Sequence, residues 1–226
     1  MVRGLNHVTE RSARELPGPV VRRLPKYLTL VQHLREGGVE WVSSADVARA
    51  LGLTGSTVRQ DLSHLKVSGL SRRGYRVAEL ERVLARVLGA DRTWKVVIVG
   101  AGNLGQALAK HGDLQRHGFE ICGIFDVDRR VIGRKVGALK VMAFSEVDGV
   151  VKERGVRLGI IAVPAWAAQE VADRLVAAGI KGVLNLAYAN VLVRPGVAVV
   201  NARILESLQE LVYMVRLGVA DRGERR

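Results

Sequence analysis

The sequence predicts an α/β protein that combines a small helical domain, a parallel-sheet domain and one further helix. Apolar residues recur at helical spacing up to about residue 90, and the following segment alternates strand-sized apolar runs with helical stretches. A glycine-rich turn, VVIVGAGNLG, joins the first of these runs to a helix. The predicted organisation is a flexible arm over residues 1–19, the helical domain over 20–90, the sheet domain over 91–201, the terminal helix over 202–218 and a tail over 219–226.

The composition predicts a soluble globular protein with excess positive charge. Of the 226 residues, 48% are hydrophobic, and the net charge is +13, which favours polyanionic partners. The apolar runs are far shorter than the roughly 20 residues that span a bilayer, and the N-terminus lacks the apolar core of a secretory signal. The single cysteine, Cys122, is expected to be a buried hydrophobe in a reducing cytoplasm, with a redox thiol as the alternative.

Two short helices separated by a glycine form a predicted helix-turn-helix. A longer helix over residues 20–35 precedes them, because apolar residues recur there at helical spacing until a pair of glycines. Ser43 and Thr54 carry hydroxyls that can cap the starts of the two short helices, and Gly52 ends the first. Residues 41–42 form either a short strand or a core anchor.

Positive charge gathers around the second short helix, where residues 54–76 hold five cations and one acid, Asp61. The second helix of a helix-turn-helix enters the major groove, where Arg, Gln, Ser and Thr can bond base edges and phosphates. Residues 68–77, with GLSRRGYRV at their centre, are predicted as a basic hairpin, or wing. The residues expected to face DNA are Ser56, Thr57, Arg59, Gln60, Ser63, Lys66, Arg72 and Arg73. The alternative is a structural helical domain with a solvated basic face.

The glycine turn predicts a dinucleotide site. In this motif Gly100 allows the sharp turn after the strand 94–99, Gly102 lets the backbone approach a pyrophosphate, and Gly105 lets helix pack on strand. The N–H groups at the start of the following helix are donors for phosphate. The alternative is a glycine turn that serves packing alone.

A second strand, FEICGIFD, ends at Asp126, at the distance where an acid binds the adenosine ribose. Such an acid repels a 2′-phosphate and favours NAD over NADP, although Arg129 and Arg130 follow closely and blur that preference. Further strands are predicted at 158–164, from 182 and at 197–200, with helices over 145–154 and 165–178. The residues expected at the ligand crevice are Gly100, Ala101, Gly102, Asn103, Leu104, Gly105, Asp126, Val163, Pro164 and Asn185.

No catalyst is evident beside this site. His111 and His117 are expected at the surface, and the sequence has no paired carboxylates, Ser-His-Asp order or metal-ligand spacing. We therefore predict no enzyme and no metal. A terminal helix over residues 204–217 is apolar almost all round, which predicts packing into a partner subunit in a twofold dimer. Burial within its own domain is the alternative.

Taken together, these motifs resemble the Rex redox-sensing transcriptional repressors, bacterial winged-helix proteins that respond to the balance of NADH and NAD. The likeness covers residues 20–217 and rests on RRLPKYL, SSADVARALG, TVRQDLSHL, GADRTWKVVIVGAGNLGQALA, FDVD and VPAWAAQEVADRLVAAGIKGVLN. It implies a winged helix-turn-helix domain, a Rossmann-like NAD(H)-binding domain and a terminal helix exchanged between the subunits of a homodimer. It also implies that NADH releases the protein from a palindromic operator in double-stranded DNA.

The resemblance assigns residues to both ligands. Arg59, Gln60, Ser63 and Arg73 would face DNA, Gly100, Gly102, Leu104, Gly105 and Asp126 would hold the adenosine half, and Val163 and Pro164 would lie near the nicotinamide. This chain departs from the family at three positions that communicate the nicotinamide state, where it has Thr29, His111 and Arg203 in place of arginine, tyrosine and aspartate. The sequence therefore leaves open whether NADH or NAD is the signal. The competing interpretations are a small NAD-dependent oxidoreductase and a CoA- or nucleotide-binding module with an added helical domain.

Overall fold

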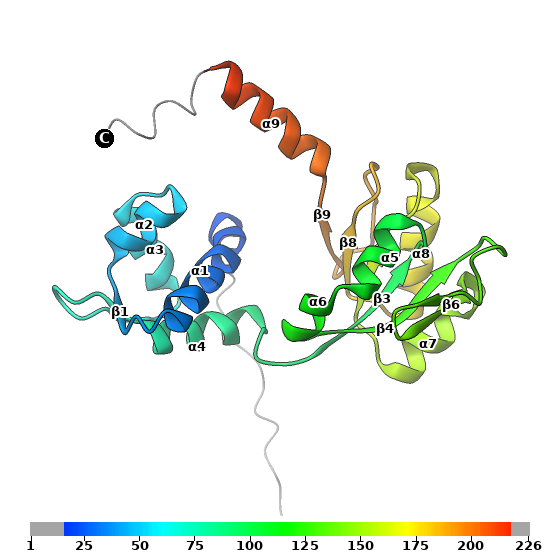
Figure 1. Cartoon of the computed structure of the whole chain (residues 1–226), viewed down its shortest axis with the longest axis horizontal. Coiled ribbons are helices and arrows are strands. Elements are labelled where there is room, and N and C mark those ends of the chain that lie inside the picture. Colours follow the sequence, from blue (N-terminus) through cyan, green and yellow to red (C-terminus); the bar gives the residue numbers. More distant parts are fainter. Residues whose placement is uncertain (1–15, 218–226) are drawn as a thin grey trace, which may run out of the picture. The chain divides into compact units, whose positions relative to one another are not determined.

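The computed structural model describes residues 16–217 and divides the chain into two compact units, residues 1–92 and 93–226 (Figure 1). The tail predicted over residues 219–226 and most of the arm predicted over 1–19 lie outside the described residues. Helix α1 begins at Gly18, two residues earlier than we predicted. Pro17 and Pro19 explain this difference, because proline is well tolerated at the start of a helix, where its missing N–H is not needed.

In the first unit, the described residues 16–92 form four helices and a two-stranded sheet around one apolar core. Its elements are α1 (Gly18–Glu36), β1 (Trp41–Val42), α2 (Ser44–Leu51), α3 (Gly55–His64), β2 (Tyr75–Arg76) and α4 (Val77–Leu88). The predicted helix-turn-helix is present as α2 and α3. Ser43 Oγ accepts a hydrogen bond from Asp46 N at 3.1 Å, and Gly52 ends α2 with a left-handed φ of 64°.

The predicted wing is only partly right. Leu70 and Gly74 close a tight turn, with Leu70 N donating to Gly74 O at 2.8 Å. The next two residues, β2, pair antiparallel with β1 rather than with the first arm of the hairpin. Residues 41–42 are therefore a strand. Helix α4 was not predicted, although its buried residues Val77, Leu80 and Leu84 have helical spacing.

The second unit is a seven-stranded sheet with helices on both faces, which confirms the predicted α/β fold class. The strand order is β5-β6-β4-β3-β7-β8-β9, and only β5 runs antiparallel to its neighbour. The elements are β3 (Trp94–Val99), α5 (Asn103–Lys110), α6 (Gly112–Arg116), β4 (Phe119–Asp126), β5 (Lys135–Val136), β6 (Leu139–Ala143), η1 (Phe144–Glu146), α7 (Val147–Arg154), β7 (Leu158–Ile161), η2 (Ala165–Ala167), α8 (Ala168–Ala178), β8 (Gly182–Asn185), β9 (Ala198–Asn201) and α9 (Ile204–Arg216).

Alternate residues of the strands bury against different helices. Val97 and Phe125 belong to a core shared with α7 and α8, whereas Val96 and Ile98 belong to a core shared with α5. Cys122 is 2% exposed, as predicted for a small buried hydrophobe, and burial raises the pKa of its thiol. The sequence did not predict β5, β6 or α6, which are short elements with little periodicity.

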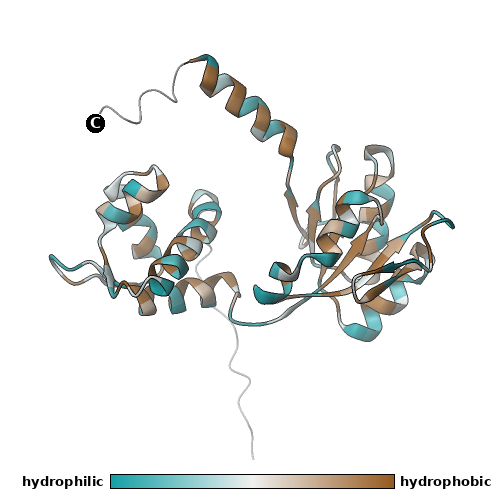
Figure 2. Cartoon of the chain, viewed as in Figure 1, coloured by the Kyte–Doolittle hydropathy of each residue, from teal (hydrophilic) through white to brown (hydrophobic). Residues whose placement is uncertain are grey.

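Helix α9 carries hydrophobic residues along its length and buries none of them in this chain (Figure 2). Its exposed large side chains are Ile204, Leu205, Leu208, Leu211, Val212, Tyr213, Met214 and Val215. Burial of this helix within its own domain, which was our alternative prediction, is therefore wrong. Among residues 16–217, no helix is both long enough and apolar enough to cross a membrane.

Candidate dinucleotide crevice and nucleic-acid interface

The carboxyl ends of the central strands lie in register at one edge of the sheet. Val99 pairs with Phe125 on one side and Ile161 on the other, and Ile161 pairs with Asn185. The loops that follow these four strands therefore begin at the same edge. In an open parallel sheet this edge is where ligands bind, at the point where successive connections turn to opposite faces.

The three glycines of the turn have different physical roles. Gly100 has a φ of 106°, and a Cβ there would collide with the Ala162 carbonyl, so this position requires glycine. A Cβ on Gly105 would collide with the Gly100 carbonyl. A Cβ on Gly102, in contrast, would meet nothing within 4 Å. Gly102 is therefore not needed for packing, and the space above it fits a closely approaching pyrophosphate.

The start of α5 is equipped to bind an anion. No side chain caps this helix, so its first N–H groups have no side-chain acceptor. Asp126 lies beside the turn, and its Oδ2 accepts a hydrogen bond from Ala101 N at 2.6 Å. Its Oδ1 accepts one from Asp128 N at 2.9 Å. The carboxylate is thus fixed in orientation at the end of β4, and each oxygen keeps a further lone pair for a ribose hydroxyl.

At the other end of the crevice, Asn185 supports a loop. Its side chain is fully buried, and Nδ2 donates to Ala189 O at 2.7 Å and to Asn201 Oδ1 at 2.9 Å. Its Oδ1 accepts from Ala187 N at 3.1 Å. These partners occupy the amide, so Asn185 shapes the loop after β8, and direct contact with a ligand stays a prediction. Val163 and Pro164 lie two and three residues after the crevice end of β7; Val163 is half-buried and Pro164 is exposed.

The three positions at which this chain departs from the family pattern each have a polar partner in the structure. Thr29 Oγ1 donates to Pro25 O at 3.1 Å within α1. Arg203 donates from Nη1 to Glu206 Oε1 at 2.8 Å and from Nη2 to Asn190 Oδ1 at 2.5 Å. Its guanidinium also lies 5.5 Å from the centre of the Tyr188 ring, while its Nε is buried without a partner. The contacts of Arg203 with Asn190 and Tyr188 thus connect the start of α9 to the loop after β8.

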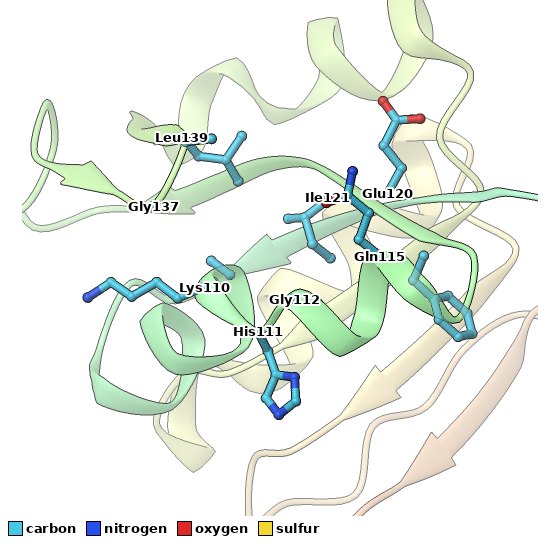
Figure 3. Close-up of a pocket in the computed structure, with 11 residues that line it drawn as sticks. Lys110, His111, Gly112, Gln115, Glu120, Ile121, Gly137 and Leu139 are labelled. Atoms are coloured by element: carbon cyan, nitrogen blue, oxygen red, sulfur yellow. The ribbon is translucent and has the colours of Figure 1, made fainter. Parts of the chain in front are cut away.

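The third of these positions, His111, lies at the corner between α5 and α6 beside a cavity of about 320 Å³ (Figure 3). Phe119 and Ile121, at the start of β4, line this cavity together with the turn at Gly137. The cavity is therefore at the opposite end of β4 from the crevice. His111 Nδ1 lies 3.7 Å from Asp113 Oδ2. Within residues 16–217 no group of three His, Cys, Asp or Glu side chains could hold a metal ion.

Most of the residues predicted to face DNA are exposed, but several have partners in the chain. The hydroxyls of Ser56 and Thr57 lie 2.9 and 2.8 Å from Thr54 Oγ1, the cap of α3, and Thr57 is half-buried. Arg59 Nη1 donates to Ser44 Oγ at 3.2 Å, and Ser63 Oγ donates to Gln60 O at 2.7 Å. The exposed members are Ser56, Arg59, Gln60, Ser63, Lys66, Arg72 and Arg73.

Two of these cations have unusual backbone conformations. Lys66 and Arg72 have φ values of 55° and 65°, and they are the non-glycine residues with positive φ in the described part of the chain. Such conformations are costly for residues that carry a Cβ. Arg73, at the tip of the wing, places its guanidinium 5.1 Å from the centre of the Trp41 ring. In the wing, Arg72 thus has a strained backbone and an exposed side chain, whereas Arg73 packs against Trp41 of β1.

Asp61 does not belong to the basic surface, because it is 2% exposed on the inner face of α3. Arg23 donates from Nε and Nη2 to the two oxygens of its carboxylate, each at 2.7 Å, and Tyr27 Oη donates to Oδ2 at 2.6 Å. This cluster connects α3 to α1. The sequence already indicates this burial, because Asp61 has helical spacing with the apolar residues Val58 and Leu65.

Comparison with known proteins decides the family. Residues 91–189 match a model described as a CoA binding domain, and residues 15–63 match one described as a putative DNA-binding protein N-terminus. A redox-sensing transcriptional repressor Rex from Thermosipho africanus is 38% identical over 91% of this chain and 99% of its own length. The Rex 1 repressor of Thermotoga maritima is 43% identical over 90% of this chain and 97% of its own. The chain belongs to the Rex family.

Solved Rex-family structures have the same fold. The repressor RSP in complex with β-NADH superposes with a TM-score of 0.83 at 34% identity, covering 92% of this chain and 98% of RSP. RSP in complex with β-NAD⁺ and operator DNA gives a TM-score of 0.84 at 34% identity, covering 93% and 99%. The match to Rex structures thus spans the helix-turn-helix, the parallel sheet and the glycine turn.

Proposed function

We propose that the protein is a transcriptional repressor that senses the NADH/NAD ratio and leaves a palindromic operator when NADH binds. One observation carries the proposal, namely that a winged helix-turn-helix and a glycine-turn crevice occur together in a chain that aligns with Rex repressors over about 90% of its length. It acts as a cytoplasmic regulator rather than as an enzyme. The nicotinamide nucleotide is therefore a signal and is not consumed.

Each part of the crevice has a defined task in this function. The N–H groups at the start of α5 bind the pyrophosphate next to Gly102, and Asp126 accepts hydrogen bonds from the adenosine ribose. Val163 and Pro164 border the nicotinamide half. The bound nucleotide supplies the redox signal. For NADH to release DNA, it must bind the DNA-free conformation more tightly, and operator DNA must weaken NADH binding by the same factor.

The proposed active form is a homodimer that packs through α9. The exposed stripe on this helix, from Ile204 to Val215, is too extensive to remain in water. A second copy of the chain can cover it in a twofold arrangement, which also presents two copies of α3 to the two halves of a palindrome. Exposed residues on α3 and in the wing, with Gln60 and Arg59 at base edges, contact the operator.

The decisive experiment is a titration of the operator complex with NADH, NAD and NADP in parallel. We expect NADH to release the DNA at the lowest concentration, and we expect NADP to act only at much higher concentrations, because Asp126 repels a 2′-phosphate. Release by none of the three nucleotides would contradict the proposal. Sustained hydride transfer to a small-molecule acceptor would instead support the oxidoreductase interpretation.

Replacing Lys66 or Arg72 by glycine is expected to increase the stability of the first unit while weakening its binding to DNA. Lys66→Gly and Arg72→Gly remove a Cβ from a left-handed conformation, so each should stabilise the first unit by about 0.5 kcal/mol. Each also removes a phosphate contact, which should lower the slope of log K against log salt by about 0.9. Thermal unfolding and operator binding at several salt concentrations measure these effects.

Lys152→Ala, which removes a cation from α7 of the second unit, is the matched control and should leave the salt slope unchanged. If the glycine variants bind operator with the same salt slope as the parent, Lys66 and Arg72 do not contact phosphate.

A further inference from the structure

The loop after β4 holds an ion pair beside the crevice. Arg130 donates from Nε to both carboxylate oxygens of Asp128, each at 3.1 Å, and from Nη2 to Oδ2 at 2.9 Å. Arg130 N also donates to Asp128 Oδ1 at 2.9 Å. These hydrogen bonds lower the pKa of Asp128 and raise that of Arg130, so both groups are charged at neutral pH. The Arg130 guanidinium is thus directed at Asp128.

The pair lies where the ribose of a dinucleotide is recognised. Asp128 N donates a hydrogen bond to Asp126 Oδ1. Asp126, which is expected to bind the ribose, and Asp128, which binds Arg130, therefore lie in the same turn. An arginine at this place is what accommodates the 2′-phosphate of NADP in other dinucleotide-binding proteins. In this chain Arg130 is within four residues of Asp126, yet its donors are directed at another carboxylate.

We propose that Asp128 is a specificity-determining residue, which holds Arg130 away from a 2′-phosphate and so lets Asp126 select NAD(H). This inference rests on the proposed function, in which the crevice binds a dinucleotide. Two effects contribute. Asp128 competes with the phosphate for the guanidinium, and its negative charge repels the phosphate directly. Exposed ion pairs are weak, so the competition alone accounts for no more than about fivefold, and the repulsion adds a similar factor.

Asp128→Asn is the informative variant. The asparagine side chain still accepts the hydrogen bond from Arg130 N, so the turn is retained, while the charge that holds the guanidinium is removed. We expect the affinity for NADPH to rise about tenfold and the affinity for NADH to change less than about threefold. Dissociation constants for both nucleotides can be measured by the fluorescence of the reduced nicotinamide, without operator DNA.

A second pair of variants tests whether Arg130 is responsible for the increase in NADPH affinity. Asp128→Asn combined with Arg130→Gln should lose the added NADPH affinity that depends on the guanidinium. Asp128→Asn combined with Arg129→Gln is the matched control, because Arg129 is the adjacent exposed arginine, and it should keep most of that affinity. A gain in Asp128→Asn that Arg130→Gln reduces supports the inference.

Three results would overturn it: an unchanged ratio of NADPH to NADH affinity in Asp128→Asn, a gain in NADPH affinity that Arg130→Gln does not reduce at all, or a parent protein that binds NADPH as tightly as NADH. Failure of the proposed function looks different. A parent protein that binds neither nucleotide would remove the dinucleotide site itself and this inference with it.

Discussion

A Gly102→Val variant is expected to lose at least about 100-fold in NADH affinity while it still binds operator DNA. The physical reason is that a side chain at this position meets no protein atom within 4 Å, and the φ of −72° is one that any residue adopts. The fold should therefore tolerate valine. The added bulk occupies the space above the first N–H groups of α5, where the pyrophosphate binds, and a loss of this size corresponds to about 2.7 kcal/mol.

Two measurements check this result, the dissociation constant for NADH and the NADH concentration that releases operator DNA. Gly149→Val is the matched control, because a Cβ at this position on α7 also meets nothing within 4 Å, and it should leave both values unchanged. If Gly102→Val releases operator at the NADH concentration that acts on the parent, the pyrophosphate does not bind at this turn.

Asp61→Ala is expected to destabilise the first unit by about 3 kcal/mol and to abolish operator binding. Asp61 is 2% exposed and accepts three hydrogen bonds from α1, so its removal leaves Arg23 and Tyr27 without their acceptor. It also removes the polar contact that connects α3 to α1. Denaturant unfolding of the whole chain, followed by circular dichroism, measures the loss.

Glu40→Gln is the control within the same unit, because the Glu40–Arg76 ion pair is exposed, with a separation of 3.4 Å. It should change the stability by less than about 0.5 kcal/mol. An Asp61→Ala protein that unfolds at the same denaturant concentration as Glu40→Gln would show that the buried cluster contributes little.

The same cluster predicts how stability depends on pH. Burial raises the pKa of Asp61, but hydrogen bonds from Arg23 and Tyr27 outweigh it, so the pKa lies below its usual value of about 3.9. The contribution of Asp61 is therefore fully present above about pH 3.9 and is lost as the pH falls through the lowered value. Unfolding measured between about pH 2 and pH 5 should show this loss in the parent, and Asp61→Asn should flatten it.

Local sequence signals were sufficient for much of the second unit. The strand and helix around the glycine turn, β3 and α5, match the prediction, because an apolar run and a glycine-rich turn determine their own backbone within a few residues. The wing differed from the prediction because β2 pairs with β1, whose residues Trp41 and Val42 lie opposite Arg76 and Tyr75 and so come from a distant part of the chain. A strand of two residues has no periodicity that would identify its partner.

The sequence by itself determined where the phosphate-binding turn and the helix-turn-helix lie, because glycine conformations and helix caps depend on neighbouring residues. Only the tertiary structure decided which charged groups are available to a ligand. Asp61 is buried in an ion pair with Arg23, and Arg203 donates a hydrogen bond to Asn190. Those partners are separated by 38 and 13 residues, and long-range pairing of polar side chains is fixed by packing rather than by local pattern.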